Sequence, residues 1–157
     1  MKVRQIMTEP VLTCRPETWL AEAARIMRTE DCGILPVIDV DGRLLGVLTD
    51  RDVCLAIATD NRSPRAIAVH EVMTKTTITA RVGDEVYAAL AVMKHGRVRR
   101  LPVLDSRGQL KGLLSLEDIV IRGLDARAVL PEEIVATLRG LYERRPVPAS
   151  SGDRRAA

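Results

Sequence analysis

The sequence predicts an α/β (α+β) fold in which two β-α-β-β-α repeats pack about a pseudo-twofold axis. The first observation is an ungapped internal repeat, because 16 of 56 positions are identical when residues 3–58 are aligned with residues 69–124. The second is that each copy alternates short apolar runs with segments of helical periodicity. The third is size: a unit of 56 residues builds only a marginal core alone, so pairing should bury the apolar helix faces of both copies.

Several short motifs mark the repeat, and all of them return at the same offset of 66 positions. They are Met7-Thr8, Leu35-Pro36-Val37, Gly42, Gly46 and Asp52, which recur as Met73-Thr74, Leu101-Pro102-Val103, Gly108, Gly112 and Asp118. This register predicts a first domain at residues 1–60, a linker at 61–66, a second domain at 67–125, a C-terminal helix at 126–145 and a disordered tail at 146–157.

The first unit is expected to begin with a short apolar strand, Val11-Leu12-Thr13-Cys14. Pro16-Glu17-Thr18 then predicts the start of a helix that runs to about Thr29. The apolar face of this helix consists of Leu20, Ala23, Ala24 and Met27.

A β-hairpin and a second helix follow. The strands Ile34 to Val40 and Leu44 to Leu48 flank Asp41-Gly42, a dipeptide typical of tight hairpin turns. Thr49 is expected to start the second helix. Its inward-facing residues are predicted to be Val53, Ala56 and Ile57.

The second unit repeats this order, and a further helix follows it. Its first helix should bury Val86, Leu90 and Met93, its turn is Arg107-Gly108, and its last helix should bury Ile119, Val120 and Leu124. Leu130-Pro131-Glu132-Glu133 is a favourable helix start, since proline suits the first position and acids suit the first turn. Ile134, Leu138 and Leu141 form the apolar stripe of that C-terminal helix.

Composition and charge indicate an aliphatic core and argue against nucleic-acid binding. Aromatic residues make up only 2% of the chain and phenylalanine is absent, so the core should be aliphatic. The net charge of +3 is divided as −3 over residues 1–60, +4 over 61–125 and +2 over 126–157. Nucleic-acid binding is not expected, because basic stripes and stacking aromatics are missing. The charge of the second half suits a local anion site better.

Other motifs point to a cytoplasmic protein without catalytic machinery. No apolar run approaches the ~20 residues that a membrane span needs, and the N-terminus lacks a signal-peptide pattern. The three cysteines, Cys14, Cys32 and Cys54, match no zinc spacing, and their odd number favours reduced thiols. His70 and His95 have no evident nucleophile or metal partner, so no enzyme activity and no required cofactor are expected.

The most informative segment is Gly46-Val47-Leu48-Thr49-Asp50-Arg51-Asp52, which recurs at residues 112–118. Thr49 with Asp52, and Ser115 with Asp118, have the spacing of capping boxes, and that structural role would be sufficient. The same geometry also suits a ligand, because a helix N-terminus presents unpaired N–H groups to an anion. A carboxylate one turn into the helix can accept hydrogen bonds from both hydroxyls of a ribose.

Together, these motifs resemble those of tandem CBS domains, which are named after cystathionine beta-synthase and form a Bateman module. The resemblance covers about residues 1–125. It implies adenosyl ligands in two clefts between the paired units. By this resemblance Asp52 and Asp118 would bind ribose, and Thr49 and Ser115 would lie near phosphate. The residues near the bases would be Thr13, Thr79, Ile34, Pro36, Arg100 and Pro102.

The two copies differ where a phosphate would lie. Arg99 and Arg100 replace Gly33 and Ile34 of the first copy. Basic residues at this point of the family often reach ligand phosphates, and arginine suits bidentate phosphate contacts. A solvated basic strand start is the alternative. Arg51 is a further phosphate candidate, and since its counterpart is Glu117, the clefts should bind unequally.

The function expected is that of a regulatory, ligand-sensing module that binds an AMP-, ADP- or ATP-like adenosyl nucleotide and signals to a separate, unknown protein target. A ligand-independent dimerisation or scaffold protein is the alternative, with the capping boxes acting only as caps. An enzyme or a DNA-binding protein is a third and less favoured hypothesis. A homodimer is expected, because the outer helix faces stay apolar after the copies pair.

Overall fold

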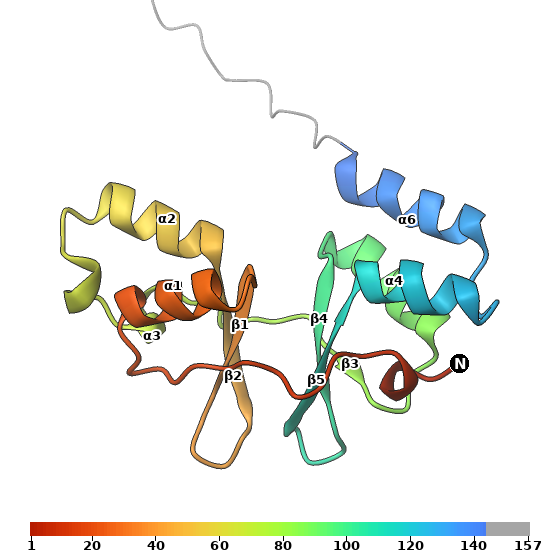
Figure 1. The fold of residues 1–157 in the computed structure, drawn as a ribbon, viewed down its shortest axis with the longest axis horizontal. Helices are drawn as coiled ribbons and strands as arrows, with labels where there is room; N and C mark the ends of the chain where they lie inside the picture. Colours follow the sequence, from red (N-terminus) through yellow and green to blue (C-terminus); the bar gives the residue numbers. More distant parts are fainter. Residues whose placement is uncertain (144–157) are drawn as a thin grey trace, which may run out of the picture.

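The structure is a computed structural model, and it describes residues 1–143. Two similar units lie side by side, each with a β-hairpin that faces the other unit and helices on its outer side (Figure 1). The first unit contains α1 (Leu20–Thr29), β1 (Ile34–Ile38), β2 (Leu44–Thr49), α2 (Asp50–Thr59) and α3 (Val69–Val72). The second contains β3 (Ala80–Arg81), α4 (Val86–Gly96), β4 (Arg100–Leu104), β5 (Leu110–Ser115) and α5 (Leu116–Asp118). Short 3₁₀ turns lie at Val3–Gln5 (η1) and Pro64–Ala66 (η2).

Both hairpins form as the sequence predicts. β1 pairs with β2 and β4 pairs with β5, antiparallel and in the same register with the same bulge. Gly42 and Gly108 have φ values of 78° and 79°, which the tight turns require and which glycine adopts without strain. The central strand residues of the hairpins, Leu35, Leu48 and Leu114 among them, are fully buried.

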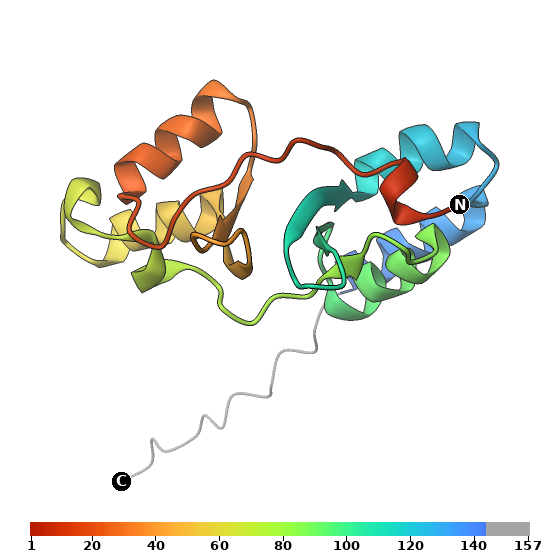
Figure 2. The ribbon, with the colours of Figure 1, turned by 90° about the horizontal axis from the view of Figure 1, so that it is seen from below.

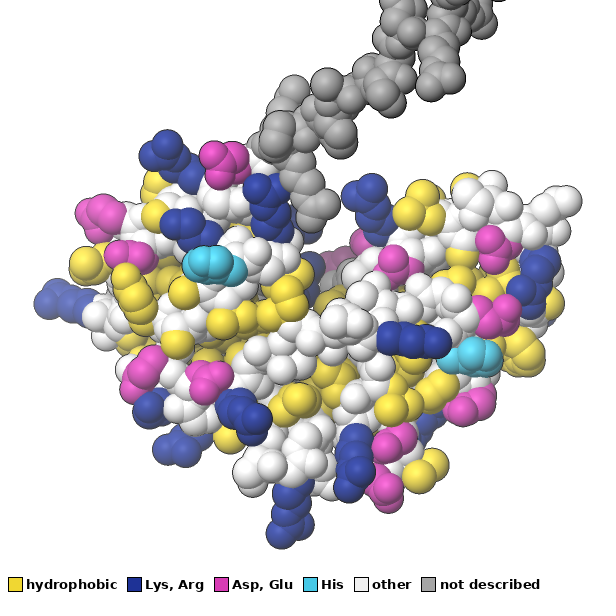
Figure 3. Space-filling view, turned by 180° about the vertical axis from the view of Figure 1, so that it is seen from behind, with side chains coloured by type: hydrophobic (Ala, Val, Ile, Leu, Met, Phe, Trp, Pro, Cys, Tyr) yellow, Lys and Arg dark blue, Asp and Glu magenta, His cyan; other side chains and the backbone are white. Residues whose placement is uncertain are grey.

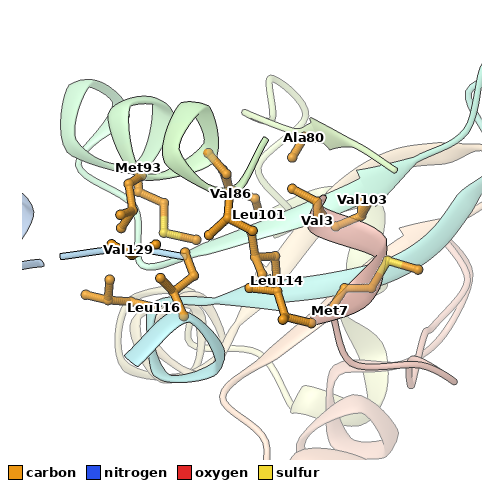
Figure 4. Packing of buried hydrophobic residues seen from close by; sticks show 14 of the residues in the cluster. Val3, Met7, Ala80, Val86, Met93, Leu101, Val103, Leu114, Leu116 and Val129 are labelled. Atoms are coloured by element: carbon orange, nitrogen blue, oxygen red, sulfur yellow. The ribbon is translucent and has the colours of Figure 1, made fainter. Parts of the chain in front are cut away.

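The N-terminal segment packs on the second unit. The Val3 amide donates to the Asp84 carbonyl at 2.9 Å, and Thr8 exchanges backbone hydrogen bonds with Leu113. Figure 4 shows Val3 and Met7 among the buried side chains of the second core. The first residues of the chain therefore complete a core that belongs otherwise to the second repeat.

The corresponding segment of the second repeat packs in turn on the first unit. Ile67 and Val69 are fully buried in the first core, and Thr74 exchanges backbone hydrogen bonds with Val47. The two connecting segments run between the units in opposite directions (Figure 2). Each repeat thus supplies its opening segment to the core of the other.

This exchange confirms the pseudo-twofold arrangement. The Thr8–Leu113 and Thr74–Val47 bridges are equivalent, because both partners shift by the repeat offset of 66 positions. A third bridge joins Arg43 to Gln109, which is its own repeat counterpart. Two residues that are exchanged by the twofold operation and pair with each other lie on either side of the axis. The axis therefore passes between the two hairpins.

The structure corrects several expected details of the first unit. The predicted strand at residues 11–14 makes only one bridge, between Cys14 and Val37. The first helix begins at Leu20 rather than near Pro16, because Thr18 and Val69 first form a backbone bond that ties this turn to the exchanged segment. Ile57 is exposed: the buried stripe of α2 consists of Val53 and Ala56, and Ile57 lies at its edge.

The last helix of the second unit departs from its counterpart in the first. After α5 the chain forms a π-helix at Ile119–Gly123 (η3), where α2 continues as a regular α-helix. Ile119 is buried as expected, while Val120 is partly exposed. π-Helical turns are rare, and they rotate the side chains that follow them relative to those of a regular helix.

The C-terminal helix α6 (Pro131–Tyr142) packs against α4. It begins with proline in its first turn, followed by Glu132 and Glu133, as the sequence indicates. Ile134 is buried in the second core, and Leu138 and Leu141 pack against it. The tail predicted to be disordered, residues 146–157, lies outside the described residues.

Candidate functional site

A cleft of about 460 Å³ lies between the two units, and we call it the first cleft. The molecular surface is notched between the two lobes, with basic side chains on the rim of the notch (Figure 3). The lining residues are Gly33, Ile34, Val47, Thr49, Asp50, Arg51, Thr74, Thr76, Thr77, Ile78, Arg97, Val98, Arg99, Arg100 and Pro102. Both repeats contribute, so the cleft exists only when the units are paired.

The N-terminus of α2 forms one wall of the first cleft. Thr49 is the N-cap, and its hydroxyl accepts from the Asp52 amide at 3.2 Å. The Asp52 carboxylate accepts from the amide and the hydroxyl of Thr49 at 2.9 and 2.7 Å, which completes the predicted capping box. The positive end of a ten-residue helix therefore lies at the cleft.

The opposite wall is the start of β4 with the turn before it. α4 ends at Gly96, and the φ of 52° at the C-cap Arg97 lies in the left-handed region that reverses the chain into the strand. Arg97, Arg99 and Arg100 follow one another around this turn, and all three line the cleft. Together with Arg51 they give four arginines against one carboxylate, that of Asp50. The first cleft is therefore strongly basic, which suits a phosphorylated or otherwise anionic ligand.

Six of the predicted site residues line this one cleft: Ile34, Thr49, Arg51, Arg99, Arg100 and Pro102. Arg51 belongs to the first repeat and the other arginines to the second. In the sequence, Arg51 and the pair Arg99-Arg100 are two separate differences between the repeats. In the structure they line the same cleft, because the exchanged packing places the α2 N-terminus of one repeat opposite the β4 start of the other.

The other predicted residues do not line the first cleft. Pro36 is buried, Thr13 and Thr79 are half-buried, and Asp52 is bonded to the lining residue Thr49 without lining the cleft itself. Ser115 and Asp118 form the equivalent capping box on the second unit, with bonds of 2.9, 2.6 and 3.0 Å. They therefore belong to the pseudo-symmetric position, which we call the second cleft.

Several lining residues were not predicted: Gly33, Val47, Asp50, Thr74, Thr76, Thr77, Ile78, Arg97 and Val98. Arg97 lies two positions before Arg99, so the basic segment Arg97-Val98-Arg99-Arg100 was the signal that could have identified it. Thr74, Thr76, Thr77 and Ile78 line the cleft because this segment crosses from one unit to the other. Sequence periodicity does not reveal such a crossing.

The two equivalent aspartates have different surroundings. In the first unit, both bonds to the Asp52 carboxylate end on Oδ2, and Oδ1 has no hydrogen-bond partner within residues 1–143. In the second unit, Asp118 Oδ1 accepts from the Thr8 hydroxyl at 3.3 Å and lies 3.9 Å from the Arg122 guanidinium. The repeat position of Arg122 is occupied by the buried Ala56 in the first unit.

A family model for the CBS domain matches residues 3–59 and again residues 69–124. The chain belongs to the CBS domain family. The two matches coincide with the two repeats, so the exchanged fold described above is a pair of CBS domains.

Curated relatives of this CBS pair include much longer proteins. Inosine-5'-monophosphate dehydrogenase of Mycobacterium tuberculosis (strain ATCC 25618 / H37Rv) is 38% identical over 116 residues, which are 73% of this chain and 21% of the dehydrogenase. The chain thus spans about a fifth of the length of the dehydrogenases it matches. An uncharacterized 17.7 kDa protein of Acidianus ambivalens is 36% identical over 129 residues, which are 82% of this chain and 76% of that protein.

Solved CBS pairs share the fold. The CBS domain pair of protein MJ0100, in complex with 5'-methylthioadenosine and S-adenosyl-L-methionine, is 27% identical with a TM-score of 0.71, covering 81% of this chain and 98% of that one. CBSX2 of Arabidopsis thaliana, in complex with AMP, is 25% identical with a TM-score of 0.71, covering 80% and 98%. Hypoxic Response Protein I, with two coordinated zinc ions, is 30% identical with a TM-score of 0.70, covering 76% and 97%.

Residues 1–143 contain no group of three or more His, Cys, Asp or Glu side chains that could hold a metal ion. Over the same part of the chain, no helix combines the length and the apolar character that a membrane crossing requires.

Proposed function

We propose that this CBS pair is a regulatory module that binds an adenosyl nucleotide in the first cleft and passes the binding signal to a separate protein target. The observation that carries the proposal is the convergence of Arg51, Arg97, Arg99 and Arg100 on one cleft beside the α2 N-terminus. The adenosyl ligands of the solved CBS pairs named above support the choice of ligand class.

Within the first cleft, the proposed roles follow from position. Thr49, Arg51, Arg99 and Arg100 bind the phosphates, since a helix N-terminus and guanidinium groups both favour oxyanions. Asp52, which is bonded to the lining residue Thr49 but does not itself line the cleft, accepts from the ribose hydroxyls through Oδ1, which has no hydrogen-bond partner within residues 1–143. Ile34, Ile78 and Pro102 provide apolar surface for the base.

Calorimetric titration of the protein with ATP, AMP and adenosine at two salt concentrations tests this proposal. Each charge-assisted hydrogen bond contributes ~1.5–3 kcal/mol, so Arg99→Ala or Arg100→Ala should weaken ATP by roughly tenfold or more. Adenosine should lose much less, because it lacks the phosphates. The loss for ATP should shrink at the higher salt concentration.

Arg107→Ala is the matched control. Arg107 is an exposed arginine on the β4–β5 turn, outside the residues that line the cleft. Its removal changes net charge as Arg99→Ala does, yet ATP affinity should stay close to that of the wild type. Equal losses for adenosine and ATP in the Arg99 and Arg100 variants would assign those side chains to packing. No binding of any of the three ligands would favour the ligand-independent scaffold.

A further inference from the structure

We propose that Asp118 and Arg122 form an intramolecular clasp that holds the N-terminal segment across the second cleft, so that the chain binds one adenosyl ligand and binds it in the first cleft. The one-ligand part rests on the proposed function, whereas the clasp does not. The two aspartates that the repeat makes equivalent would then have different tasks: Asp52 serves the ligand and Asp118 serves the fold.

The clasp is inferred from the contacts of Arg122 with the N-terminal segment and with Asp118. Its guanidinium donates to the Ile6 carbonyl at 2.8 Å and to the Met7 carbonyl at 3.4 Å, and it lies 3.9 Å from Asp118 Oδ1. Thr8, the next residue along, donates its hydroxyl to the same Oδ1 at 3.3 Å. Three consecutive residues of the N-terminal segment are thus tied to one ion pair.

This arrangement has no equivalent on the first unit. Residue 56 is alanine, so the first unit has no guanidinium at the position of Arg122. Thr74, the counterpart of Thr8, lines the first cleft, and Asp52 Oδ1 is left without a partner within residues 1–143. The carboxylate oxygen proposed to accept from a ribose therefore has no partner on Asp52, whereas the equivalent oxygen of Asp118 is already bonded to Thr8.

The backbone around residue 122 also differs from that of the first unit. Arg122 lies inside the π-helical turn η3, whereas the same stretch of α2 is a regular α-helix. A π-turn changes the direction in which the following side chains leave the helix. At this repeat position the second unit therefore differs from the first in both residue type and backbone.

Charge also distinguishes the two clefts. In the repeat register, Asp31 and Glu117 replace Arg97 and Arg51, whereas Arg99 and Arg100 exchange places with Gly33 and Ile34 and so belong to both positions. The Glu117 carboxylate lies 3.8 Å from the guanidinium of Arg100, an arginine that also lines the first cleft. A phosphorylated ligand would meet carboxylates where the first cleft offers guanidinium groups, and like charges disfavour its binding.

Two measurements test the proposal together. Titration calorimetry with ATP should give one site per chain, Asp52→Asn should weaken ATP at least tenfold, and Arg122→Ala should leave the dissociation constant within about twofold. Hydrogen exchange should show the opposite pattern. The Thr8 amide, which donates to the Leu113 carbonyl at 2.8 Å, should exchange faster in Arg122→Ala and unchanged in Asp52→Asn.

The possible outcomes distinguish the clasp from the single ligand site. Two ATP sites per chain, or unchanged exchange of the Thr8 amide in Arg122→Ala, would overturn the inference. If ATP, AMP and adenosine all fail to bind, the proposed function fails, and the exchange experiment alone still decides the clasp. Should Arg122→Ala not fold, Thr8→Val removes one bond to Asp118 at an exposed site and should accelerate the same exchange to a smaller degree.

Discussion

Two glycines at equivalent repeat positions, Gly46 and Gly112, lie where the exchanged segments cross the hairpins. A Cβ atom on Gly46 would come within 2.7 Å of the Thr74 carbonyl oxygen, which is backbone. A Cβ atom on Gly112 would come within 2.5 Å of the Met7 sulfur, which belongs to a flexible side chain. Methionine can adopt another rotamer, whereas the Thr74 carbonyl is fixed by its pairing with Val47.

We therefore predict that Gly46→Ala destabilises the protein more than Gly112→Ala does. Overpacking of this kind typically costs ~1–3 kcal/mol, and Gly46→Ala should lie near the upper end because a backbone segment must move. Urea denaturation of both variants measures the difference. Equal losses would mean that the second unit is no more adaptable than the first at this contact.

The pKa of Glu71 gives a second test at the level of one residue. The hydrogen bond from the Arg62 guanidinium, followed by that from the Ala68 amide, lowers the pKa of Glu71 from 4.5 to about 2. Since the folded-state pKa is the lower one, this contribution to stability is present above about pH 4.5 and is lost as the pH falls toward 2. NMR titration should find the low value, and Arg62→Met should raise it. A Glu71 pKa unchanged by that substitution would contradict the assigned cause.

Among the secondary-structure elements, α6 shows how a terminal helix is attached by few side chains. Ile134 is 6% exposed in the second core, and its neighbour Val135 is 56% exposed. Ile134→Ala should cost ~2–4 kcal/mol, because it removes buried methyl groups and leaves a cavity. Val135→Ala on the same helix is the matched control and should change stability by less than about 0.5 kcal/mol. Similar losses for both would show that α6 does not contribute through the second core.

The elements that depend on local patterns could be predicted from the sequence, and those that depend on the exchange could not. The turns at Gly42 and Gly108 and the caps at Thr49 and Ser115 are set by residues close in sequence, and each is found where it was expected. The crossing of the opening segments depends on long-range contacts, such as Met7 in the second core. The apolar character of a residue predicts that it is buried, but it does not predict which of two similar cores the residue joins.

The candidate site, too, could be predicted from the sequence only in part. Arg51, Arg99 and Arg100 were identified as phosphate candidates from their residue type and repeat position. Their convergence on one cleft follows only from the pairing of the units. The contacts of Arg122 were missed altogether, because an arginine in the middle of a helical segment has the pattern of a solvated face.

For the whole molecule, we predict a homodimer. Leu55 and Ile121 occupy the same repeat position on the two units, and they are 51% and 63% exposed. Two apolar side chains related by the internal axis present a symmetric surface to a second copy. Light scattering at micromolar concentration should give the dimer mass, and a monomer mass would contradict the prediction.

Substitution should locate the contact between the two copies. Leu55→Glu combined with Ile121→Glu should shift the molecule to the monomer, because charges would be buried at the contact. Val40→Glu is the control, since Val40 is 88% exposed near the β1–β2 turn, away from these helices, and should leave the mass unchanged.

The exchanged opening segments also determine what would happen if the polypeptide were cut. A break in the 61–66 linker would leave an N-terminal fragment that holds Val3 and Met7 for the other half's core, and a C-terminal fragment that holds Ile67 and Val69 for the first. Neither fragment could complete its own interior. The two should therefore behave as complementing fragments, whose reassembly depends on concentration and restores a native particle without a covalent link.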